Sequence, residues 1–464
     1  MRLIQKSLAS YPVLQGIQTI ATREFRGVNT LDPYSIGDEF FTDMRNLVTD
    51  DYPAIKTRPG YTRLGSKIGS RVLGLGVWKD QELHAIFNDG TWRKWTGSTW
   101  QTLLNGLNTS ADWTFTNFKG NLDDVNLIGC NGVNGLYRYD GSTVQKFGDA
   151  EDKINFITTY QNRLWGAWEN ELHASALNQP DKWQLFEGTE ADSYYIVIET
   201  DRGEDINMLS GGLRKLTIGM RNSLHELYGG VPSDFNTHMK TNDVGFINNK
   251  SAVTQDGVLR FMHELGIYEF AGGLLPDDSF SEIVKKYIKV DDTSVSGTDG
   301  EKIYFYTNGV ILVYDPAFQT WCVWDHIQPS HFALLKNELY IGTRSGEVLK
   351  MGGSTDNGTA IQWRAVTKPY NNLTPSQRTR WHKLYVTVDL PQGSTFRVYG
   401  TREPEADSGW VLLKSVSGGN LQQQRIFVPV RELANEHYVR LKFEGQGPMK
   451  LYGFTRHVRV MPLV

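Results

Sequence analysis

The sequence predicts an all-β protein: a roughly seven-bladed β-propeller followed by a small C-terminal β-sandwich of jelly-roll type. Two observations predict this fold class. A unit of short apolar strands and Gly- or Asp-rich turns recurs about every 43 residues, near the length of a four-stranded propeller blade. The recurrence then stops, and six alternating strands without a helical pattern occupy the last part of the chain.

One marker residue per unit makes the recurrence visible. Each marker lies late in the strand that precedes a Gly- or Asp-rich turn, and the gaps between markers range from 36 to 52 residues. Strands of about five residues joined by short turns fill such a length. The seven markers are Trp95, Tyr139, Ser175, Leu227, Phe270, Tyr314 and Met351.

The clearest unit is Leu259–Gly273, LRFMHELGIYEFAGG. It predicts a strand over Leu259–Met262, a tight turn at Glu264-Leu265-Gly266 and a second strand that ends at Gly272-Gly273. Between units, the region near Glu187–Tyr195 indicates an insertion, and residues 229–249 indicate a long connection. No segment carries a 3.6-residue apolar stripe over twelve residues, so helices are not expected to dominate.

The first 66 residues are predicted to form an N-terminal arm and a lead-in to the propeller. Residues 25–65 alternate short apolar pieces with polar turn signals, and Glu39–Leu47 could form one helical turn. Tyr61–Leu64 looks like a strand that follows the turn residues Arg58-Pro59-Gly60. A ring of blades leaves unpaired edges where its ends meet. Since the chain continues past the last blade, we expect residues within 52–66 to pair with the seventh blade.

Three domains follow from these patterns: 1–66, the propeller over 67–370, and the sandwich over 371–464. The polar stretch 371–380, NNLTPSQRTR, predicts a linker between the last two. The six sandwich strands are expected at 381–390, 395–400, 410–416, 424–430, 437–445 and 451–460.

Composition excludes several classes of protein. A net charge of −4 and a pI near 6.2 give no reason to expect binding to nucleic acid or to a membrane surface. No apolar run reaches the roughly 18 residues of a membrane-spanning helix. The N-terminus lacks the pattern of a secretory signal, so the protein is expected to be intracellular when made. Cys130 and Cys322 are expected to be two reduced, buried thiols.

The sequence shows no catalytic, cofactor-binding or metal-binding motif. H-E-x-x-H, H-x-H, C-x-x-C, G-x-S-x-G and a Walker loop are all missing, so we expect no catalytic residues, no cofactor and no metal. Gly74 and Gly76 are interpreted as glycines that permit close packing between blades. A glycosidase would need paired carboxylates over the channel.

Acidic pairs do occur, and we expect them to cap turns or face water. They lie in polar stretches at Asp50-Asp51, Asp123-Asp124, Asp277-Asp278 and Asp291-Asp292. The sequence Asp356-Asn357-Gly358 could bind calcium, but a type I′ turn is the better interpretation.

The 13 tryptophans leave two interpretations open. Trp92, Trp95, Trp165, Trp321 and Trp324 sit at strand positions, where packing inside or between blades is expected. A carbohydrate-binding propeller would instead expose aromatic side chains such as Trp78, Trp100 or Trp168 on one rim. Arg163 is expected to bind carbonyl groups at strand ends.

Several stretches resemble β-propeller virion proteins of tailed bacteriophages, of the tail-nozzle, tail-hub and head–tail assembly type. They are FRGVNTLDP…DMRNLVTDDYPAIKTRPGYTRL (25–64), INFITTYQNRLWGAW…LHASALNQPDKW (154–183) and DVGFINNKSAVTQDGVLRFMHELGIYEFAGG (243–273). A fourth comprises Thr320-Trp321, Gly342, Gly346-Glu347-Val348 and Asp356-Asn357-Gly358. The likeness covers most of 25–460.

The resemblance implies a structural virion component that forms a ring or tip and performs no enzymatic chemistry. Its expected location is the virion, after synthesis in the bacterial host cytoplasm. Its expected partners are other tail or connector proteins and further copies of the chain in a homo-oligomeric ring. DNA passage through the assembly stays open, whereas sequence-specific DNA binding is not expected. The alternative is a carbohydrate-binding propeller that recognises a host-surface glycan. The family motifs mark turns and blade cores, so they carry over no functional residues.

Overall fold

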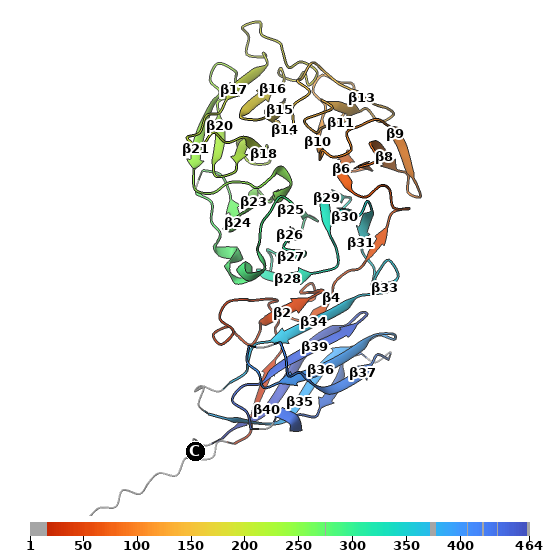
Figure 1. The fold of residues 1–464 in the computed structure, drawn as a ribbon, viewed down its shortest axis with the longest axis vertical. Coiled ribbons are helices and arrows are strands. Elements are labelled where there is room, and N and C mark those ends of the chain that lie inside the picture. Colours follow the sequence, from red (N-terminus) through yellow and green to blue (C-terminus); the bar gives the residue numbers. More distant parts are fainter. Residues whose placement is uncertain are drawn as a thin grey trace, which may run out of the picture. The chain divides into compact units, whose positions relative to one another are not determined.

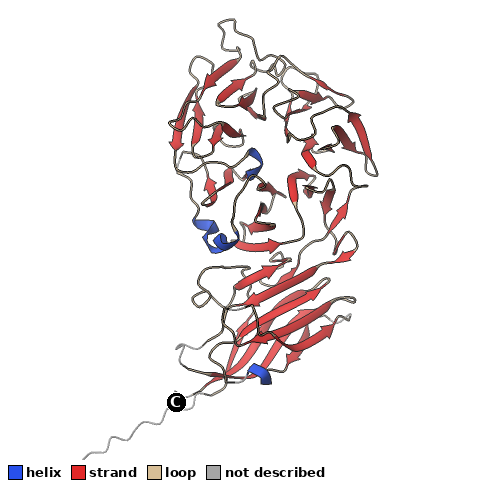
Figure 2. Cartoon of the chain, viewed as in Figure 1, coloured by secondary structure: helices blue, strands red, loops and turns tan. Residues whose placement is uncertain are grey.

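The structure is a computed structural model that describes residues 16–273, 275–371, 377–405, 407–419, 422–433 and 435–461. The chain forms two compact units, one of Pro59–Thr359 and one that joins Met1–Arg58 to Ala360–Val464. Strands make up nearly all of the regular structure, with three short 3-10 helices among the described residues (Figure 2). The predicted all-β class is confirmed.

The described part of Pro59–Thr359 contains seven sheets, antiparallel except for the pairing of β5 with β32, arranged as propeller blades around one axis (Figure 1). Strands that follow one another in the chain pair with each other, as short turns favour. The first strand of each blade lies nearest the axis (Figure 1). Blade 1 is β6 (Val72–Trp78), β7 (Glu82–Phe87), β8 (Thr91–Trp95) and β9 (Trp100–Leu104); blade 2 is β10 (Thr114–Phe118), β11 (Asn126–Cys130), β12 (Tyr137–Tyr139) and β13 (Val144–Lys146). Blade 3 is β14 (Phe156–Tyr160), β15 (Arg163–Trp168), β16 (Glu171–Ala174) and β17 (Tyr194–Val197); blade 4 is β18 (Ile206–Ser210), β19 (Thr217–Met220), β20 (Leu224–Tyr228) and β21 (Asn236–Thr241).

The last three blades are less uniform. In blade 5 a 3-10 helix, η2 (Ser279–Tyr287), follows the third strand and contacts it, where the other blades have a fourth strand. Blade 5 is β22 (Ala252–Gln255), β23 (Val258–His263) and β24 (Gly266–Phe270); blade 6 is β25 (Val295–Thr298), β26 (Ile303–Thr307), β27 (Val310–Asp315) and β28 (Thr320–Trp324). Blade 7 is β29 (Pro329–Leu335), β30 (Glu338–Thr343) and β31 (Val348–Met351), extended by β5 (Tyr61–Arg63), β32 (Thr355–Asp356) and β33 (Thr359–Ala360).

All seven marker residues lie in, or directly after, the third strand of a blade. The 43-residue recurrence therefore measures one full blade. The long connection expected over 229–249 is only partly a loop, because it contains β21, the fourth strand of blade 4. That strand is largely exposed, so it lacks the apolar alternation by which strands are recognised.

The core of the propeller lies between neighbouring blades. Leu73 and Trp92 of blade 1 share one buried cluster with Trp113 and Leu127, which belong to blade 2. The close approach requires glycine: a Cβ on Gly74 would lie 2.7 Å from the Trp113 Cβ. A Cβ on Gly76 would likewise lie 2.9 Å from the Phe115 ring. The interpretation of both glycines as packing residues is confirmed.

The N-terminal lead-in closes the ring. β5 pairs antiparallel with β31, with Tyr61 opposite Met351 and Arg63 opposite Leu349. An ion pair of 3.0 Å between Arg63 and Glu347 supports the same contact. The pairing predicted for residues within 52–66 is present, and it covers the outer edge that β31 would otherwise expose.

The second unit is a sandwich of two sheets. In one sheet, β1 (Gln18–Thr22) pairs with β40 (Lys450–Val460), which also lies in the order β3 (Leu47–Val48), β4 (Ile55–Thr57), β40, β35 (Thr379–Asp389), β38 (Gln424–Val428). The other has the order β2 (Phe41–Arg45), β34 (Gln362–Thr367), β39 (Arg440–Gln446), β36 (Thr395–Thr401), β37 (Val411–Ser417). Phe443 and Phe454 come from opposite sheets and meet at 5.5 Å between ring centroids, so the core lies between the sheets. The six predicted strands are all present as β35–β40.

The unit boundaries differ from those expected at 66/67 and 370/371. The structure divides the chain after Arg58 and after Thr359, so the N-terminal segment completes the sandwich before it reaches the propeller. β34 also belongs to the sandwich, because it pairs with β2 on one side and β39 on the other. Of the expected linker 371–380, residues 372–376 lie outside the described residues, and β35 already begins at Thr379.

The helical turn expected at Glu39–Leu47 is wrong; β2 and β3 occupy this stretch. Phe41 and Met44 are both buried, and their three-residue spacing imitates a helical face. The ladder between β2 and β34 explains the spacing, because its register shifts between Phe41 and Asp43. Such a bulge places residues three apart on the same face of a strand.

Candidate binding site at the channel mouth

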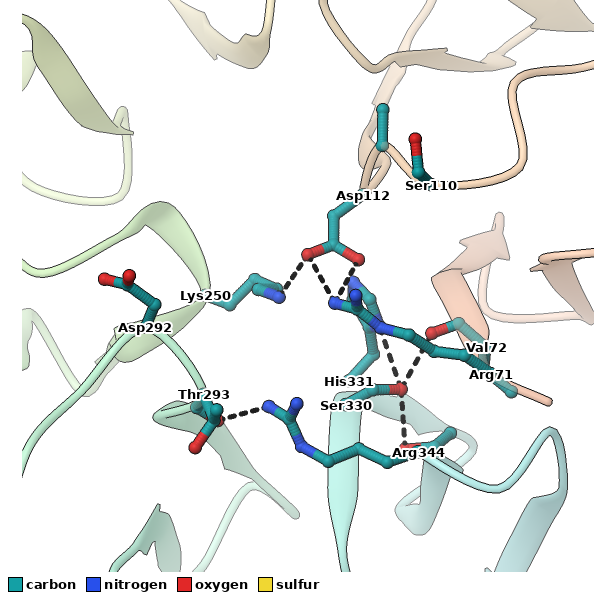
Figure 3. A network of polar contacts seen from close by, with 12 residues as sticks. Arg71, Val72, Ser110, Asp112, Lys250, Asp292, Thr293, Ser330, His331 and Arg344 are labelled. Atoms are coloured by element: carbon teal, nitrogen blue, oxygen red, sulfur yellow. Dashed lines mark hydrogen bonds and ion pairs between the residues drawn. The ribbon is translucent and has the colours of Figure 1, made fainter.

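The propeller brings five polar residues together at one end of its axis, and we call them the channel-mouth cluster (Figure 3). Residues just before the first strand of a blade lie at this end of the axis. The residue that follows β30 also lies there, because β30 is the second strand of its blade and runs antiparallel to the first. The cluster consists of Arg71 before β6, Asp112 before β10, Lys250 in the 3-10 helix η1 (Asn249–Ser251), His331 in β29 and Arg344 after β30.

Asp112 binds two cations from two other blades. Both of its carboxylate oxygens lie 2.8 Å from Nη2 of Arg71, and one also accepts a hydrogen bond from Nζ of Lys250. Burial by itself would raise the pKa of Asp112, but the charges of Lys250 and Arg71 help to outweigh burial and hold it below its usual value. Burial lowers the pKa of Lys250 despite its contact with Asp112. The carboxylate is therefore ionised at neutral pH and joins blades 1, 2 and 5.

Arg344 carries a charge without a carboxylate partner among the described residues. Its Nη2 donates to the carbonyl of Thr293 at 2.6 Å, and its Nε donates to the carbonyl of Pro329 at 3.2 Å. Burial, and next the charge of Arg71, lower the pKa of Arg344. Two backbone groups thus orient the guanidinium, and the charges of Asp112 and Asp291 offset burial and the charge of Arg71 only in part.

His331 is 7% exposed and uncharged at neutral pH. Burial, reinforced by the charge of Lys250, lowers its pKa to about 3. Its Nδ1 lies 3.3 Å from Oγ of Ser330, which itself donates to carbonyls of Val72 and Gly342. Nε2 of His331 and Nε of Arg71 are buried and have no hydrogen-bond partner in the described part of the chain.

A cavity of about 610 Å³ adjoins the cluster. Asp112 and Lys250 line one side, and the loops before the first strands of blades 3 and 4 line the other. The remaining polar lining includes Asn131, Lys153, Asn155, Glu169, Asp205, Asn248 and Asn249. This volume falls within the range of pockets that bind small molecules.

A second, smaller cavity of about 370 Å³ lies against blade 3 and is lined by aromatic rings. The Trp168 indole stacks on His173 with 4.1 Å between ring centroids, and His173 stacks in turn on Tyr195. Glu171 holds Nε2 of His173 at 3.0 Å, and burial keeps the pKa of His173 below its usual value. Asp149, Glu151, Trp183, Gln184 and Phe186 complete the lining with Ile154.

The tryptophans singled out from the sequence differ in burial and in contacts. Those expected in the core are buried at positions 92, 165, 321 and 324, and Trp95 is half-buried. The indole N–H groups of Trp78 and Trp100 donate to the carbonyls of Val125 and Leu64, so both rings are anchored in the fold. Trp168 differs from them, because it borders both cavities.

Arg163 is buried and binds strand-end carbonyls, as predicted. Nη1 donates to the carbonyls of Ser175 and Asp192, and Nη2 donates to that of Glu190 at 2.8 Å. These bonds fix the insertion between β16 and β17. The guanidinium therefore has a structural role inside blade 3.

The acidic pairs behave as turn or ion-pair residues. Asp51 contacts Lys56 and Lys450 at 2.9 and 2.7 Å, and Asp291 accepts from the backbone N–H of Thr293. Asp124 binds Lys79. In the sequence considered for calcium, Asn357 and Gly358 have φ values of 47° and 91°, as a type I′ turn between β32 and β33 requires.

Cys130 and Cys322 are both buried and neither forms a disulfide, as expected. Burial raises the pKa of the Cys130 thiol. The described residues contain no group of three or more His, Cys, Asp or Glu side chains arranged to hold a metal ion. They also contain no helix that is long and apolar enough to cross a membrane.

Sequence reasoning missed the channel-mouth cluster. Its members are scattered over 71–344 and share no local motif. One signal was available: Arg71, Asp112 and Lys250 each stand one or two residues before the first strand of a blade. Aligning the starts of the repeated units would have placed these charges in one ring.

No protein-family model matches the chain, and no curated protein matches it. Among solved structures, it is similar to the computationally designed protein Ika8, at 8% identity over 64% of this chain and 100% of that chain, with a TM-score of 0.42. It is also similar to the WD40 domain of Neurospora crassa Pan2, at 10% identity over 64% and 95% of the two chains, with a TM-score of 0.44. The extracellular domain of a one-component system from B. thetaiotaomicron gives 11% identity over 88% and 62%, with a TM-score of 0.44. Likenesses this distant carry no argument about function, and the fold assignment rests on the strand pairing itself.

Proposed function

We propose that the chain is a structural component of a tailed-bacteriophage virion, a tail- or nozzle-type protein that forms a ring or tip through protein–protein contacts. It acts without enzymatic chemistry, and its partners are tail or connector proteins and further copies of itself. The proposal starts from the sequence resemblance, and two features of the molecule support it.

The first feature is that the stretches resembling the phage proteins form turns and contacts within the blades. In the stretch 154–183, Gln161 and Asn162 have positive φ values and make the turn between β14 and β15. Arg163 then fixes the insertion, and the Trp183 indole donates to the carbonyl of Pro180 at 2.9 Å. These residues build a blade, as expected of a scaffold protein.

The second feature, which carries the proposal, is that the end strand of each sandwich sheet exposes apolar side chains. β37 and β38 end the two sheets, and each pairs with only one neighbour among the described strands. Val411 and Leu412 on β37 and Phe427 on β38 are about half exposed. Edge strands that present apolar side chains favour pairing with another chain. Either end strand therefore suits contacts between subunits.

Mass spectrometry of purified particles of a phage that encodes the sequence tests the proposal. The protein should be present in mature virions, and its absence would refute the virion role. The contact surface is tested separately by chromatography with light scattering of the full chain. Leu412→Asp should dissociate the oligomer, whereas Leu265→Asp, an exposed leucine in the blade 5 hairpin, should leave it intact.

DNA passage is part of the proposal only for an assembly of several subunits. The ion pair between Lys250 and Asp112 connects blades that are not neighbours, so it crosses the middle of the propeller. A lumen wide enough for a duplex would lie between subunits.

The second candidate function is binding of a host-surface glycan, and the aromatic cavity of blade 3 favours it. Sugar sites combine a ring for stacking with carboxylate and amide groups. Trp168, Glu171 and Gln184 offer this combination around one cavity. A glycan array with the full chain should then show specific binding that Trp168→Ala removes and Trp78→Phe retains. Binding to no glycan would eliminate this candidate.

A further inference from the structure

The channel-mouth cluster has more positive than negative charge. Arg71, Lys250 and Arg344 provide three cations, and Asp112 is the one carboxylate in ion-pair contact with any of them among the described residues. Figure 3 shows the three cationic side chains extending from different elements toward one region. His331 adds no charge at neutral pH. Within the cluster, positive charges therefore outnumber the single carboxylate.

The three cations of the cluster repel one another. The charges of Arg71 and Arg344 both lower the pKa of Lys250, and the charge of Arg71 lowers that of Arg344. Like charges in a partly buried site repel, because the surrounding dielectric screens them less than water does. A bound anion would relieve this repulsion.

Hydrogen-bond capacity at the cluster is also unfilled. Arg344 uses two of its donors on the carbonyls of Thr293 and Pro329, which fix its orientation. Nε of Arg71 is a buried donor without an acceptor. A buried polar group without a partner is unfavourable, so such groups point to an unfilled contact.

The adjoining cavity gives room for a ligand, and its charged lining is mixed. Glu169, Asp205 and Lys153 lie on the side of blades 3 and 4, and Asp112 lies with Lys250 on the side of the cluster. An anionic group is therefore favoured at Lys250, next to the other cations of the cluster and away from Glu169 and Asp205. The rest of a small molecule could extend toward the asparagine side chains.

We propose that this mouth of the propeller binds a small multivalent oxyanion, such as phosphate or a polycarboxylate. Lys250 and Arg344 bind it directly, and Arg71 contributes charge while it remains bound to Asp112. The planar guanidinium of Arg344 presents paired donors that fit carboxylate and phosphate oxygens. This inference goes beyond the virion role and does not depend on it.

Isothermal titration calorimetry of the full chain at pH 7 tests the proposal with inorganic phosphate and with citrate, at constant ionic strength set by chloride. Both anions should bind saturably in the micromolar to millimolar range. Arg344→Gln should weaken binding about tenfold or more, as expected for the loss of one charge-assisted hydrogen bond. Arg344→Lys, which keeps the charge, should lose less.

The matched control is Arg93→Gln on β8, which removes an arginine paired with Asp89 at 2.8 Å. It should bind like the wild type. The proposal is refuted if neither anion binds saturably to the wild type. It is also refuted if Arg93→Gln loses as much affinity as Arg344→Gln. Because phosphate stabilises many proteins without a site, a rise in Tm alone does not count. Line broadening of the phosphate ³¹P resonance by the wild type provides a readout that requires no variant.

Discussion

Lys250 and Asp112 form an ion pair although they belong to blades 5 and 2, which are not neighbours in the ring. The contact links residues 138 positions apart in the chain. Most stabilising contacts of a propeller join adjacent blades, so the stability of a blade depends mainly on its two neighbours. This pair instead connects opposite sides of the ring, and Asp112 extends the link to Arg71 of blade 1.

Replacing Asp112 should destabilise the protein more than replacing Lys250. Asp112→Asn leaves two cations without their carboxylate, whereas Lys250→Met leaves Asp112 paired with Arg71. We expect a loss of about 2 kcal/mol for Asp112→Asn, below the value for a fully buried pair because the side chains are partly exposed. Urea unfolding of the full chain measures the free energy of unfolding of both variants. The double variant completes a double-mutant cycle. Equal losses for the two single variants would contradict the link through Arg71.

Gly219→Ala should disturb the packing between blades 4 and 5. A Cβ at this position would lie 2.2 Å from the Phe246 ring, so the ring must move. We expect a loss of about 1–3 kcal/mol, the usual range for overpacking. The control is Gly230→Ala, where a Cβ meets nothing within 4 Å. Phe246→Leu should be less harmful in the Gly219→Ala background than alone; strictly additive effects would argue against this contact.

Because β5 pairs with β31, we expect a propeller fragment to fold properly only if it begins before β5. A fragment of residues 59–359 should fold as a monomer, because it retains every strand of the seven blades apart from the last residue of β33. A fragment of residues 67–359 lacks β5 and should aggregate or melt at a lower temperature, since the edge of β31 is uncovered. Chromatography and thermal unfolding compare the two. Identical behaviour would show that β5 is dispensable for closure.

Removal of residues 371–464 should expose an incomplete sandwich. That truncation keeps β2 and β34 but deletes β39, to which β34 is paired. We expect a poorly soluble protein with a folded propeller, and further trimming to residue 359 should restore solubility. A soluble monomer that ends at residue 370 would mean that β34 does not need the second unit.

Acid should destabilise the protein through two buried histidines. Burial lowers the pKa of His84 to about 4 and that of His331 to about 3. Both folded values lie below the ordinary value of 6.5, so the unfolded state binds protons more readily, and stability falls as pH drops below 6.5. The loss for each residue is on the order of 3 kcal/mol at pH 4.

Urea midpoints between pH 7 and 4 measure this effect. His84 accepts a hydrogen bond from the Trp92 indole at 3.0 Å, and His84→Gln keeps an acceptor there without a titrating ring. This variant should flatten the pH dependence, whereas His238→Gln, at an exposed position, should not. A midpoint independent of pH would show that neither buried ring resists protonation.

The repeat, its length and the strand pattern were readable from the sequence because each is local. A blade needs short apolar strands and turn residues, and Asn357-Gly358 or Gly272-Gly273 display these without any tertiary information. Gly74 and Gly76 were also interpretable, since glycine inside a strand indicates close approach of another chain segment. Local chemistry likewise indicated that Arg163 would bind backbone carbonyls.

The sequence by itself thus determined the all-β class, the seven blades, the six C-terminal strands and the strand that closes the ring. Only the tertiary structure decided that residues 16–58 and β34 complete the sandwich, because β1, β2 and β4 pair with strands more than 300 residues away in the chain. It also decided the channel-mouth cluster. Arg71, Asp112, Lys250, His331 and Arg344 become neighbours only when the ring closes, and no local pattern encodes which charges meet across it.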